Sequence, residues 1–205
     1  MPVLAIANPK GGVGKTTLAA HIAGHWARCG HAVMLGDVDR QQSAAQWLAL
    51  RPAAARPIAG WDVSRADVLK PPRGTTHVVL DTPAGLHGQR LREVLRRADR
   101  LLVPLQPSVF DIYATHAFLA TVRERSPAEL RVAVVAMRVD ERTLAARQLQ
   151  AFLDTLQVPV VGWIREAQLY RHLAAQGLTL FDVRPTQVER ELRQWQPLLA
   201  WLDAP

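Results

Sequence analysis

The sequence predicts an α/β fold in which a doubly wound, mostly parallel sheet carries helices on both faces. Short apolar runs alternate with helical patterns along the whole chain. The runs are apolar without strict alternation, as expected of strands that are covered on both faces. A glycine-rich loop follows the first of them. In sheets of this kind, ligands bind at the carboxyl ends of the strands.

The expected elements follow one another in a regular order. Strands are predicted at residues 3–7, 32–38, 77–80, 101–105, 132–137 and 158–164. Helices are predicted at residues 15–29, 42–50, 90–98, 112–124, 142–156, 166–175 and 186–202. The proline-rich stretch at 51–74 has a linker-like composition but is too short to separate two domains. We therefore expect residues 1–205 to form a single domain.

The composition is that of a soluble globular protein. Hydrophobic residues make up 49% of the chain and charged residues 21%, which leaves little room for long disordered tails. No apolar run approaches the roughly 20 residues that span a bilayer, and the N-terminus has no signal-peptide pattern, so a cytoplasmic protein is expected. The single cysteine, Cys29, excludes a disulfide framework and is expected to be a small buried residue.

The chain is basic, with a net charge of +7 and an isoelectric point near 10.6. This charge indicates a polyanionic partner, most simply nucleic acid. The excess lies between residues 51 and 137, and its densest part contains Arg90, Arg92, Arg96, Arg97 and Arg100. A solvated helix face with no ligand is the alternative explanation for this cluster.

The segment from Lys10 to Thr17 reads K-G-G-V-G-K-T-T and predicts a phosphate-binding loop. Its glycines, Gly11, Gly12 and Gly14, allow a tight loop whose backbone N–H groups point at a polyphosphate. The helix that starts near Gly14 adds its positive end to the same anion.

Two side chains of this loop have specific roles in the prediction. Lys15 is placed to reach the β and γ phosphates, and the Thr16 hydroxyl is placed to ligate Mg²⁺. Two of the chain's three lysines, Lys10 and Lys15, lie in the loop, where a compact ammonium fits between phosphate oxygens. Pro9 stands where the usual phosphate loop has its first glycine.

Carboxylates stand at the ends of two further predicted strands. The second strand ends in G-D-V-D, with Asp37 and Asp39 on the same side of an extended chain. Asp81 ends the next apolar strand, at the position from which phosphate-loop proteins reach the Mg²⁺. A helix cap is the alternative role for Asp37.

With these motifs in order, the chain resembles the ParA/MinD family of deviant Walker-A ATPases, which have the P-loop NTPase fold. The motifs are the phosphate loop, the D-x-D at 37–39 and the D-T-P-A-G at 81–85. The chain has no helix-turn-helix domain before the loop, and residues 103–114 and 164–181 are also similar to short ParA proteins of plasmid partition, such as ParF. The resemblance extends over nearly the whole chain.

The resemblance implies ATP and Mg²⁺ as cofactors and an ATP-dependent homodimer. Lys10 would be the signature lysine, which reaches the partner's phosphates. Asp39 would position or activate the attacking water, although Arg40 replaces the proline that usually follows it. The implied catalytic residues are Lys10, Lys15 and Asp39. The implied metal-site residues are Thr16, Asp39 and Asp81. The implied nucleotide-binding residues are Lys10, Gly11, Gly12, Val13, Gly14, Lys15, Thr16, Thr17, Met137 and Arg138.

The resemblance also implies a function, which is DNA segregation by a slow ATPase. Its ATP-bound dimer would bind duplex DNA without sequence preference, and a separate ParB-type adaptor would stimulate hydrolysis to position a plasmid or other cargo. The protein would then be associated with the nucleoid when ATP is bound. The implied DNA contacts are Arg165, Arg171, His172 and Arg184, which would bind phosphates.

Two other functions remain open from the sequence. A MinD-like membrane switch would need a C-terminal amphipathic helix, and a stripe of apolar residues does occur at Val188, Leu192, Trp195, Leu199 and Leu202. The opposite face mixes Glu189, Arg190, Glu191 and Arg193, and Pro197 interrupts the pattern, so packing on the sheet is the preferred explanation and no membrane partner is expected. A phosphate-loop metabolic ligase would need a substrate pocket, and no polar constellation for one is found.

The histidines do not predict a metal site. Only His21 and His25 have a ligand-like spacing, four residues apart on the first predicted helix. Since no third ligand lies near them in the sequence, both are expected to be packing residues.

Overall fold

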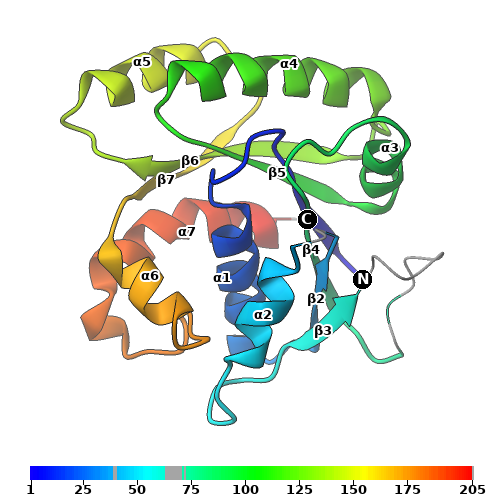
Figure 1. Ribbon diagram of the computed structural model, residues 1–205, viewed down its shortest axis with the longest axis vertical. Helices are drawn as coiled ribbons and strands as arrows, with labels where there is room; N and C mark the ends of the chain where they lie inside the picture. Colours follow the sequence, from blue (N-terminus) through cyan, green and yellow to red (C-terminus); the bar gives the residue numbers. More distant parts are fainter. Residues whose placement is uncertain (39–40, 63–70, 72, 205) are drawn as a thin grey trace.

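A computed structural model describes residues 1–38, 41–62, 71 and 73–204. Within these residues seven strands form one parallel sheet in the order β3-β2-β4-β1-β5-β6-β7 (Figure 1). The strands are β1 (Val3–Ile6), β2 (Val33–Asp37), β3 (Ala59–Asp62), β4 (His77–Asp81), β5 (Arg100–Leu105), β6 (Arg131–Val139) and β7 (Val160–Arg165).

Helices cover the sheet in two layers, and the expected doubly wound α/β fold is confirmed (Figure 1). One layer contains α1 (Lys15–Arg28), α2 (Ser43–Ala49), α6 (Gln168–Ala174) and α7 (Glu189–Asp203). The other contains α3 (Gly88–Arg97), α4 (Val109–Arg125) and α5 (Leu144–Leu153). A short 3₁₀ helix, η1 (Pro185–Gln187), precedes α7.

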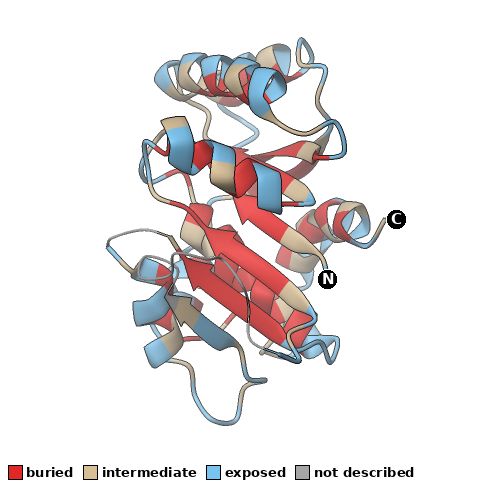
Figure 2. Cartoon of the chain, turned by 90° about the vertical axis from the view of Figure 1, so that its right-hand side faces the viewer, coloured by how far each residue is buried: buried red, intermediate tan, exposed pale blue. Residues whose placement is uncertain are grey.

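Alternating side chains of the central strands divide the core into two halves. In and after β1, Leu4 and Ile6 pack with the α1 layer, whereas Ala5 and Ala7 pack with the α3–α5 layer. Figure 2 shows the strands buried and the exposed residues on the outer sides of the helices. A central strand buried on both faces explains why the sequence shows continuous apolar runs without alternation.

The position of β1 explains where a ligand site is to be found. It lies between β4 and β5. The connection after β1 leads through α1 to β2 on one side, whereas the connection after β4 leads through α3 to β5 on the other side. The loop after β1 therefore lies at the point where the order of the strands reverses, which is where open α/β sheets bind ligands.

α7 continues through Pro197, as the helix expected at 186–202 requires. The proline has no N–H for the Arg193 carbonyl, and both residues are exposed, so this carbonyl is open to water.

Two expectations from the sequence are wrong in detail. Residues 59–62, within the linker-like stretch, form the edge strand β3, whose four residues are too few for a periodic pattern. Cys29 is exposed at the end of α1 and not buried.

The apolar stripe of the last helix packs on the sheet as core, as preferred from the sequence. Trp195 is fully buried, stacks on His21 of α1 and donates its indole N–H to the Tyr170 hydroxyl at 3.1 Å. Glu191, expected on the exposed face, is buried. No helix within the described ranges combines the length and the apolar character needed to cross a bilayer.

A buried ion pair ties the end of α2 to the segment after α6. The Arg51 guanidinium donates to both carboxylate oxygens of Asp182, at 2.9 and 2.8 Å, and also donates to the Gly177 carbonyl. The Thr179 N–H and hydroxyl donate to the same carboxylate, at 2.8 and 2.7 Å. Since both charged side chains are almost fully buried, removing one partner leaves the other charge without compensation.

We predict that Arg51→Met lowers the free energy of unfolding by about 3 to 5 kcal/mol, since Asp182 then remains buried without its cation. Urea denaturation at pH 7 measures the loss. Arg142→Met is the matched control, because its pair with Asp140 is exposed, and it should cost less than about 1 kcal/mol. Equal losses in the two variants would contradict the prediction.

The same pair has an expected pH dependence. Burial alone would raise the pKa of Asp182, but hydrogen bonds from Arg51 and Thr179 and the Arg51 charge hold this pKa below its ordinary 3.8. The pair therefore stabilises the fold fully above pH 3.8, and this stabilisation is lost as the pH falls through the folded-state pKa. The stability gap between the wild type and Arg51→Met should narrow below about pH 4.

Candidate functional site

The loop after β1 is fixed in place by one buried side chain, Asn8. Its amide nitrogen donates to the Pro104 carbonyl of β5 at 2.7 Å and to the Thr115 hydroxyl of α4 at 3.0 Å. Its amide oxygen accepts the Lys10 backbone N–H at 2.8 Å. The start of the glycine-rich segment is therefore fixed to both the neighbouring strand and a helix.

The glycines give this loop a backbone that other residues would strain. Gly12 and Gly14 have φ angles of +73° and +98°, in the left-handed region. A Cβ at Gly14 would also lie 2.9 Å from the Met137 Cε, so the loop approaches the end of β6 closely. α1 begins directly after Gly14 and has no acidic residue in its first turn, which leaves its positive end available to an anion.

Lys15 points its ammonium back into this loop. The Nζ atom donates to the Lys10 carbonyl at 2.7 Å and to the Asn8 carbonyl at 3.4 Å, and the side chain is buried. The loop thus surrounds a positive charge with its own backbone. Lys10 is half-buried, and its charge partly offsets the rise that burial causes in the pKa of Asp111 at the start of α4.

Two oxygen atoms meet beside this loop. The Thr16 hydroxyl donates to Asp81 Oδ2 at 2.7 Å, and Asp81 is buried at the end of β4. The register of the sheet brings them together, because Asp81 is paired with Ile6 of β1. The Thr82 hydroxyl donates to the Ile6 carbonyl at 2.8 Å and secures this alignment. A hydroxyl and a carboxylate are donors of the kind that Mg²⁺ prefers.

Asp37 caps a helix, which is the alternative role that the sequence suggested for it. Its Oδ2 accepts the backbone N–H groups of Ala44 and Ala45, at 2.8 and 3.2 Å, in the first turn of α2. Asp39 and Arg40 lie outside the described residues.

Met137 and Arg138, predicted to contact the adenine, lie next to the phosphate loop. They line a small cavity of about 100 Å³ together with Gly14 and Thr17 of the loop. Arg138 has a positive φ of 55°, a strained conformation for a side chain of this size. Arg165 and Arg171 line the same cavity, so two residues expected to contact DNA lie beside residues expected to contact the nucleotide.

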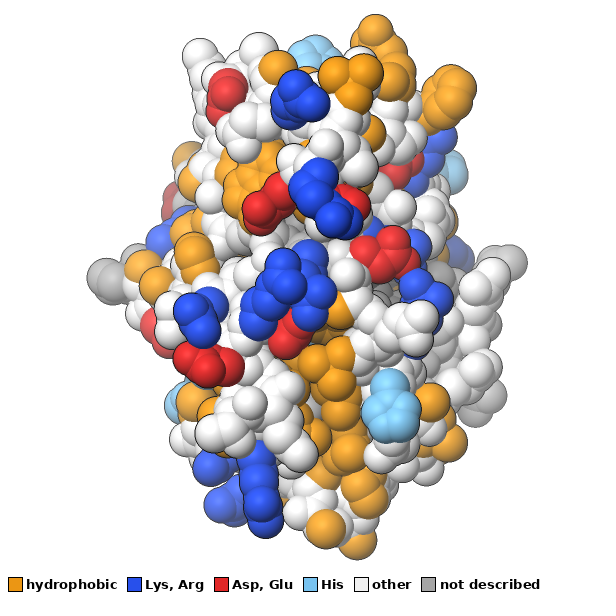
Figure 3. Space-filling view, turned by 90° about the vertical axis from the view of Figure 1, so that its left-hand side faces the viewer, with side chains coloured by type: hydrophobic (Ala, Val, Ile, Leu, Met, Phe, Trp, Pro, Cys, Tyr) orange, Lys and Arg blue, Asp and Glu red, His pale blue; other side chains and the backbone are white. Residues whose placement is uncertain are grey.

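The four residues expected to contact DNA differ in whether they form ion pairs. Arg165 is paired with the buried Glu191 of α7, and Arg171 is paired with Glu166 at 2.6 Å on the surface. His172 and Arg184 are exposed. Figure 3 faces the side on which β6 and β7 end, where basic and acidic side chains are mixed and form no continuous basic patch.

The two histidines with ligand-like spacing are packing residues, as expected. His21 is buried between Tyr170 and Trp195, and burial lowers its pKa to about 4. His25 packs against Phe181. Among the residues that the structure describes, no group of three or more His, Cys, Asp or Glu side chains is placed to hold a metal.

Two residues that shape the site, Asn8 and Thr115, were missed from the sequence. Gln106, in the loop after β5, donates its side-chain amide to the Gly12 carbonyl at 2.6 Å. Asn8 has only the local signal of an Asn-Pro turn after an apolar strand, which does not reveal its partners. Thr115 has none, because a lone threonine within a helical segment does not reveal its partner.

The proteins to which this chain is similar agree with the geometry of the site. Residues 4–180 match a family model described as the CobQ/CobB/MinD/ParA nucleotide binding domain. The maintenance of carboxysome distribution protein A of Gloeobacter kilaueensis is 32% identical over 191 residues, with 89% of this chain and 85% of the relative covered. The chromosome-partitioning ATPase Soj of Thermus thermophilus is 29% identical over 187 residues, with 73% and 74% covered.

Solved structures of low sequence identity share the fold. The MinD cell division protein of Aquifex aeolicus aligns with a TM-score of 0.76 at 18% identity, covering 100% of this chain and 99% of that one. The ATP complex of a Cyanothece McdA variant aligns with a TM-score of 0.72 at 18% identity, covering 97% and 96%. The expected P-loop NTPase fold and the resemblance to ParA and MinD proteins are confirmed. The chain belongs to the CobQ/CobB/MinD/ParA nucleotide-binding domain family.

Proposed function

We propose that this chain is an ATPase that positions or partitions a cargo in the cell. The observation that carries the proposal is the arrangement at the ends of β1 and β4. There Lys15 is held inside a glycine loop, and the Thr16 hydroxyl meets the Asp81 carboxylate at 2.7 Å. A buried cation, a helix N-terminus and a pair of oxygen ligands together are suited to a nucleoside triphosphate with its metal.

The proposed ligand is ATP with Mg²⁺. The phosphates would lie in the loop formed by Lys10, Gly11, Gly12, Val13 and Gly14, and would bind Lys15, Thr16 and Thr17. The adenine would contact Met137 and Arg138. Thr16 and Asp81, together with Asp39, would hold the Mg²⁺, which when bound neutralises charge on the β and γ phosphates.

Hydrolysis would require two further residues. We assign Asp39 to positioning the attacking water. We assign Lys10 to the phosphates of a second subunit in an ATP-dependent homodimer, where its charge would act as an arginine finger does. A site that needs a second subunit hydrolyses ATP slowly as a monomer, and a separate adaptor protein of the ParB type would accelerate it.

The relatives support positioning as the general activity and leave the cargo open. One is named for the distribution of carboxysomes and another for the partitioning of chromosomes. Plasmids, chromosomes and protein compartments are therefore all candidate cargoes. We place the protein in the cytoplasm, bound to nucleoid DNA in the ATP state through exposed basic residues such as Arg171 and Arg184.

We predict that Thr16→Val removes the part of ATP affinity that depends on Mg²⁺, because valine keeps the shape but not the oxygen ligand. Isothermal titration with a slowly hydrolysed ATP analogue, with Mg²⁺ and with EDTA, should show a Mg²⁺-dependent gain in the wild type that falls at least about tenfold in the variant. Thr121→Val is the control, since this hydroxyl only bonds a carbonyl of α4. An unchanged gain in Thr16→Val would remove Thr16 from the proposed metal site.

We predict that Lys10→Ala abolishes dimerisation with ATP while ATP binding by the monomer persists. Sedimentation with ATP and single-turnover hydrolysis at several protein concentrations measure the two properties. The wild type should hydrolyse faster as its concentration rises, and the variant should not. Lys70→Ala, which alters the one lysine outside the loop, is the control. Fast hydrolysis by wild-type monomer, independent of concentration, would sink the dimer model.

We predict that DNA binding depends on the C-terminal third of the chain. Arg171→Glu with Arg184→Glu should weaken ATP-dependent binding to random-sequence duplex more than Arg92→Glu with Arg96→Glu, which carries the same charge change on α3. Each lost phosphate contact should also lower the slope of log affinity against log salt by about 1. The opposite ranking would assign DNA to the exposed α3 arginines, which make no ion pair within the described part of the chain.

A further inference from the structure

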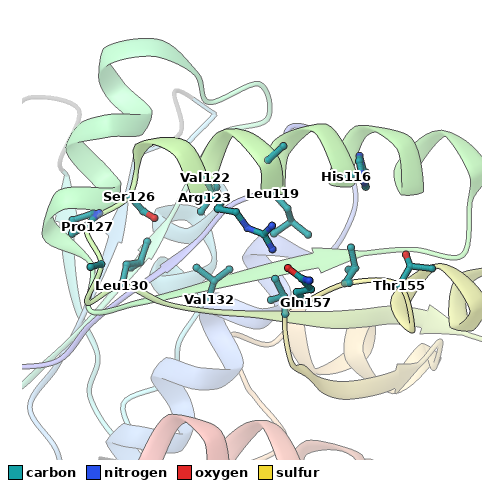
Figure 4. A pocket seen from close by; sticks show the side chains of 14 residues that line it. His116, Leu119, Val122, Arg123, Ser126, Pro127, Leu130, Val132, Thr155 and Gln157 are labelled. Atoms are coloured by element: carbon teal, nitrogen blue, oxygen red, sulfur yellow. The ribbon is translucent and has the colours of Figure 1, made fainter.

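A second cavity, of about 680 Å³, lies on the other side of the sheet from α1, beneath the C-terminal half of α4. Figure 4 shows its walls: α4 above, the start of β6 below, and the connection from α5 to β7 along one side. Val132, the second residue of β6, lies on its floor. The cavity is therefore at the amino-terminal edge of the sheet, whereas the phosphate loop is at the carboxyl edge.

The groove has no acidic side chain, since its 14 lining residues include no Asp or Glu. Val132, Leu156 and Val158 are half-buried and supply the accessible apolar surface. Arg123 extends from α4 toward Gln157 on the opposite wall (Figure 4). Arg123 is exposed and makes no ion pair with any residue that the structure describes. A cation beside half-buried apolar side chains favours a ligand that has apolar groups and one negative charge.

The shape of the groove decides between a compact and an elongated occupant. Its lining on α4 extends from His116 to Arg123, which is about 10 Å at a helical rise of 1.5 Å per residue. The lining continues past the end of the helix to Pro127. Figure 4 shows His116 and Pro127 at opposite ends, with Arg123 between them. A groove that follows about two helical turns and continues beyond them fits a short protein segment better than a compact metabolite.

We propose that this groove is a docking site for a partner protein, which inserts an apolar segment with one acidic side chain opposite Arg123. The partner's apolar residues would cover the half-buried Val132, Leu156 and Val158, and its carboxylate would pair with the guanidinium in a partly desolvated setting. Nucleic acid is a poor match, because a single arginine beside apolar side chains offers it few phosphate contacts. Since the groove and the phosphate loop are at opposite edges of the sheet, a docked partner would leave the nucleotide site uncovered.

The test uses a phage-displayed library of random dodecapeptides selected on the wild-type protein. Enriched peptides should combine apolar residues with one Asp or Glu. When made synthetically, they should bind Arg123→Glu at least about tenfold more weakly than wild type by fluorescence anisotropy. Arg125→Glu is the matched control, since it makes the same charge change on the same helix outside the groove. Changing the peptide's acid to Arg should restore binding to Arg123→Glu.

Every other outcome contradicts the proposal. The groove is not a peptide site if no sequence is enriched, or if the enriched peptides are basic or bind Arg123→Glu and wild type equally. Sedimentation of nucleotide-free protein tests whether the occupant of the groove is instead a second copy of this chain. If the wild type self-associates and Arg123→Glu is monomeric, the groove belongs to that contact. Unchanged ATP binding by Arg123→Glu verifies that the variant is folded.

Discussion

The phosphate loop depends on the hydrogen bonds of Asn8. A single buried amide donates to β5 and α4 and accepts from the loop itself. Aspartate has no N–H to give to the Pro104 carbonyl, and leucine can make none of these bonds, so few side chains could replace it. Because buried polar groups are costly when unsatisfied, the three partners hold Asn8 and the loop in one arrangement. That arrangement sets the positions of Lys10 and Lys15.

The helix that follows the loop, α1, packs against α6 and α7 through an uncharged histidine, His21. His21 Nδ1 lies 2.9 Å from the Thr17 carbonyl, so this nitrogen carries the proton, and Nε2 has no hydrogen-bond partner among the described residues. A bare lone pair is less costly to bury than a charge, and burial lowers the His21 pKa to about 4. The rings of Tyr170 and Trp195 pack around it. The α6–α7 layer therefore supports α1 by packing and not by charge.

Sequence reasoning was reliable where a pattern is local and weaker where a role depends on a distant partner. The alternating strands and helices and the glycine loop are local, and the fold they predict is confirmed. β3 was missed because an edge strand of four residues has no period. Glu191 was placed on the exposed face because helical spacing does not show that Arg165, on β7, offers it a buried partner. Asn8 and Thr115 form a contact across 107 residues of sequence, which no single-sequence pattern reveals.

The hydrogen bonds of Lys15 have a consequence for ligand selection. Two of the hydrogen bonds that its ammonium donates go to neutral carbonyl oxygens of the loop. A neutral oxygen from an incoming molecule would only replace one ammonium–oxygen hydrogen bond with another of the same kind. An anionic oxygen would add the attraction between two opposite charges to that hydrogen bond. The loop thus favours anionic ligands over neutral ones, whatever the shape of the rest of the ligand.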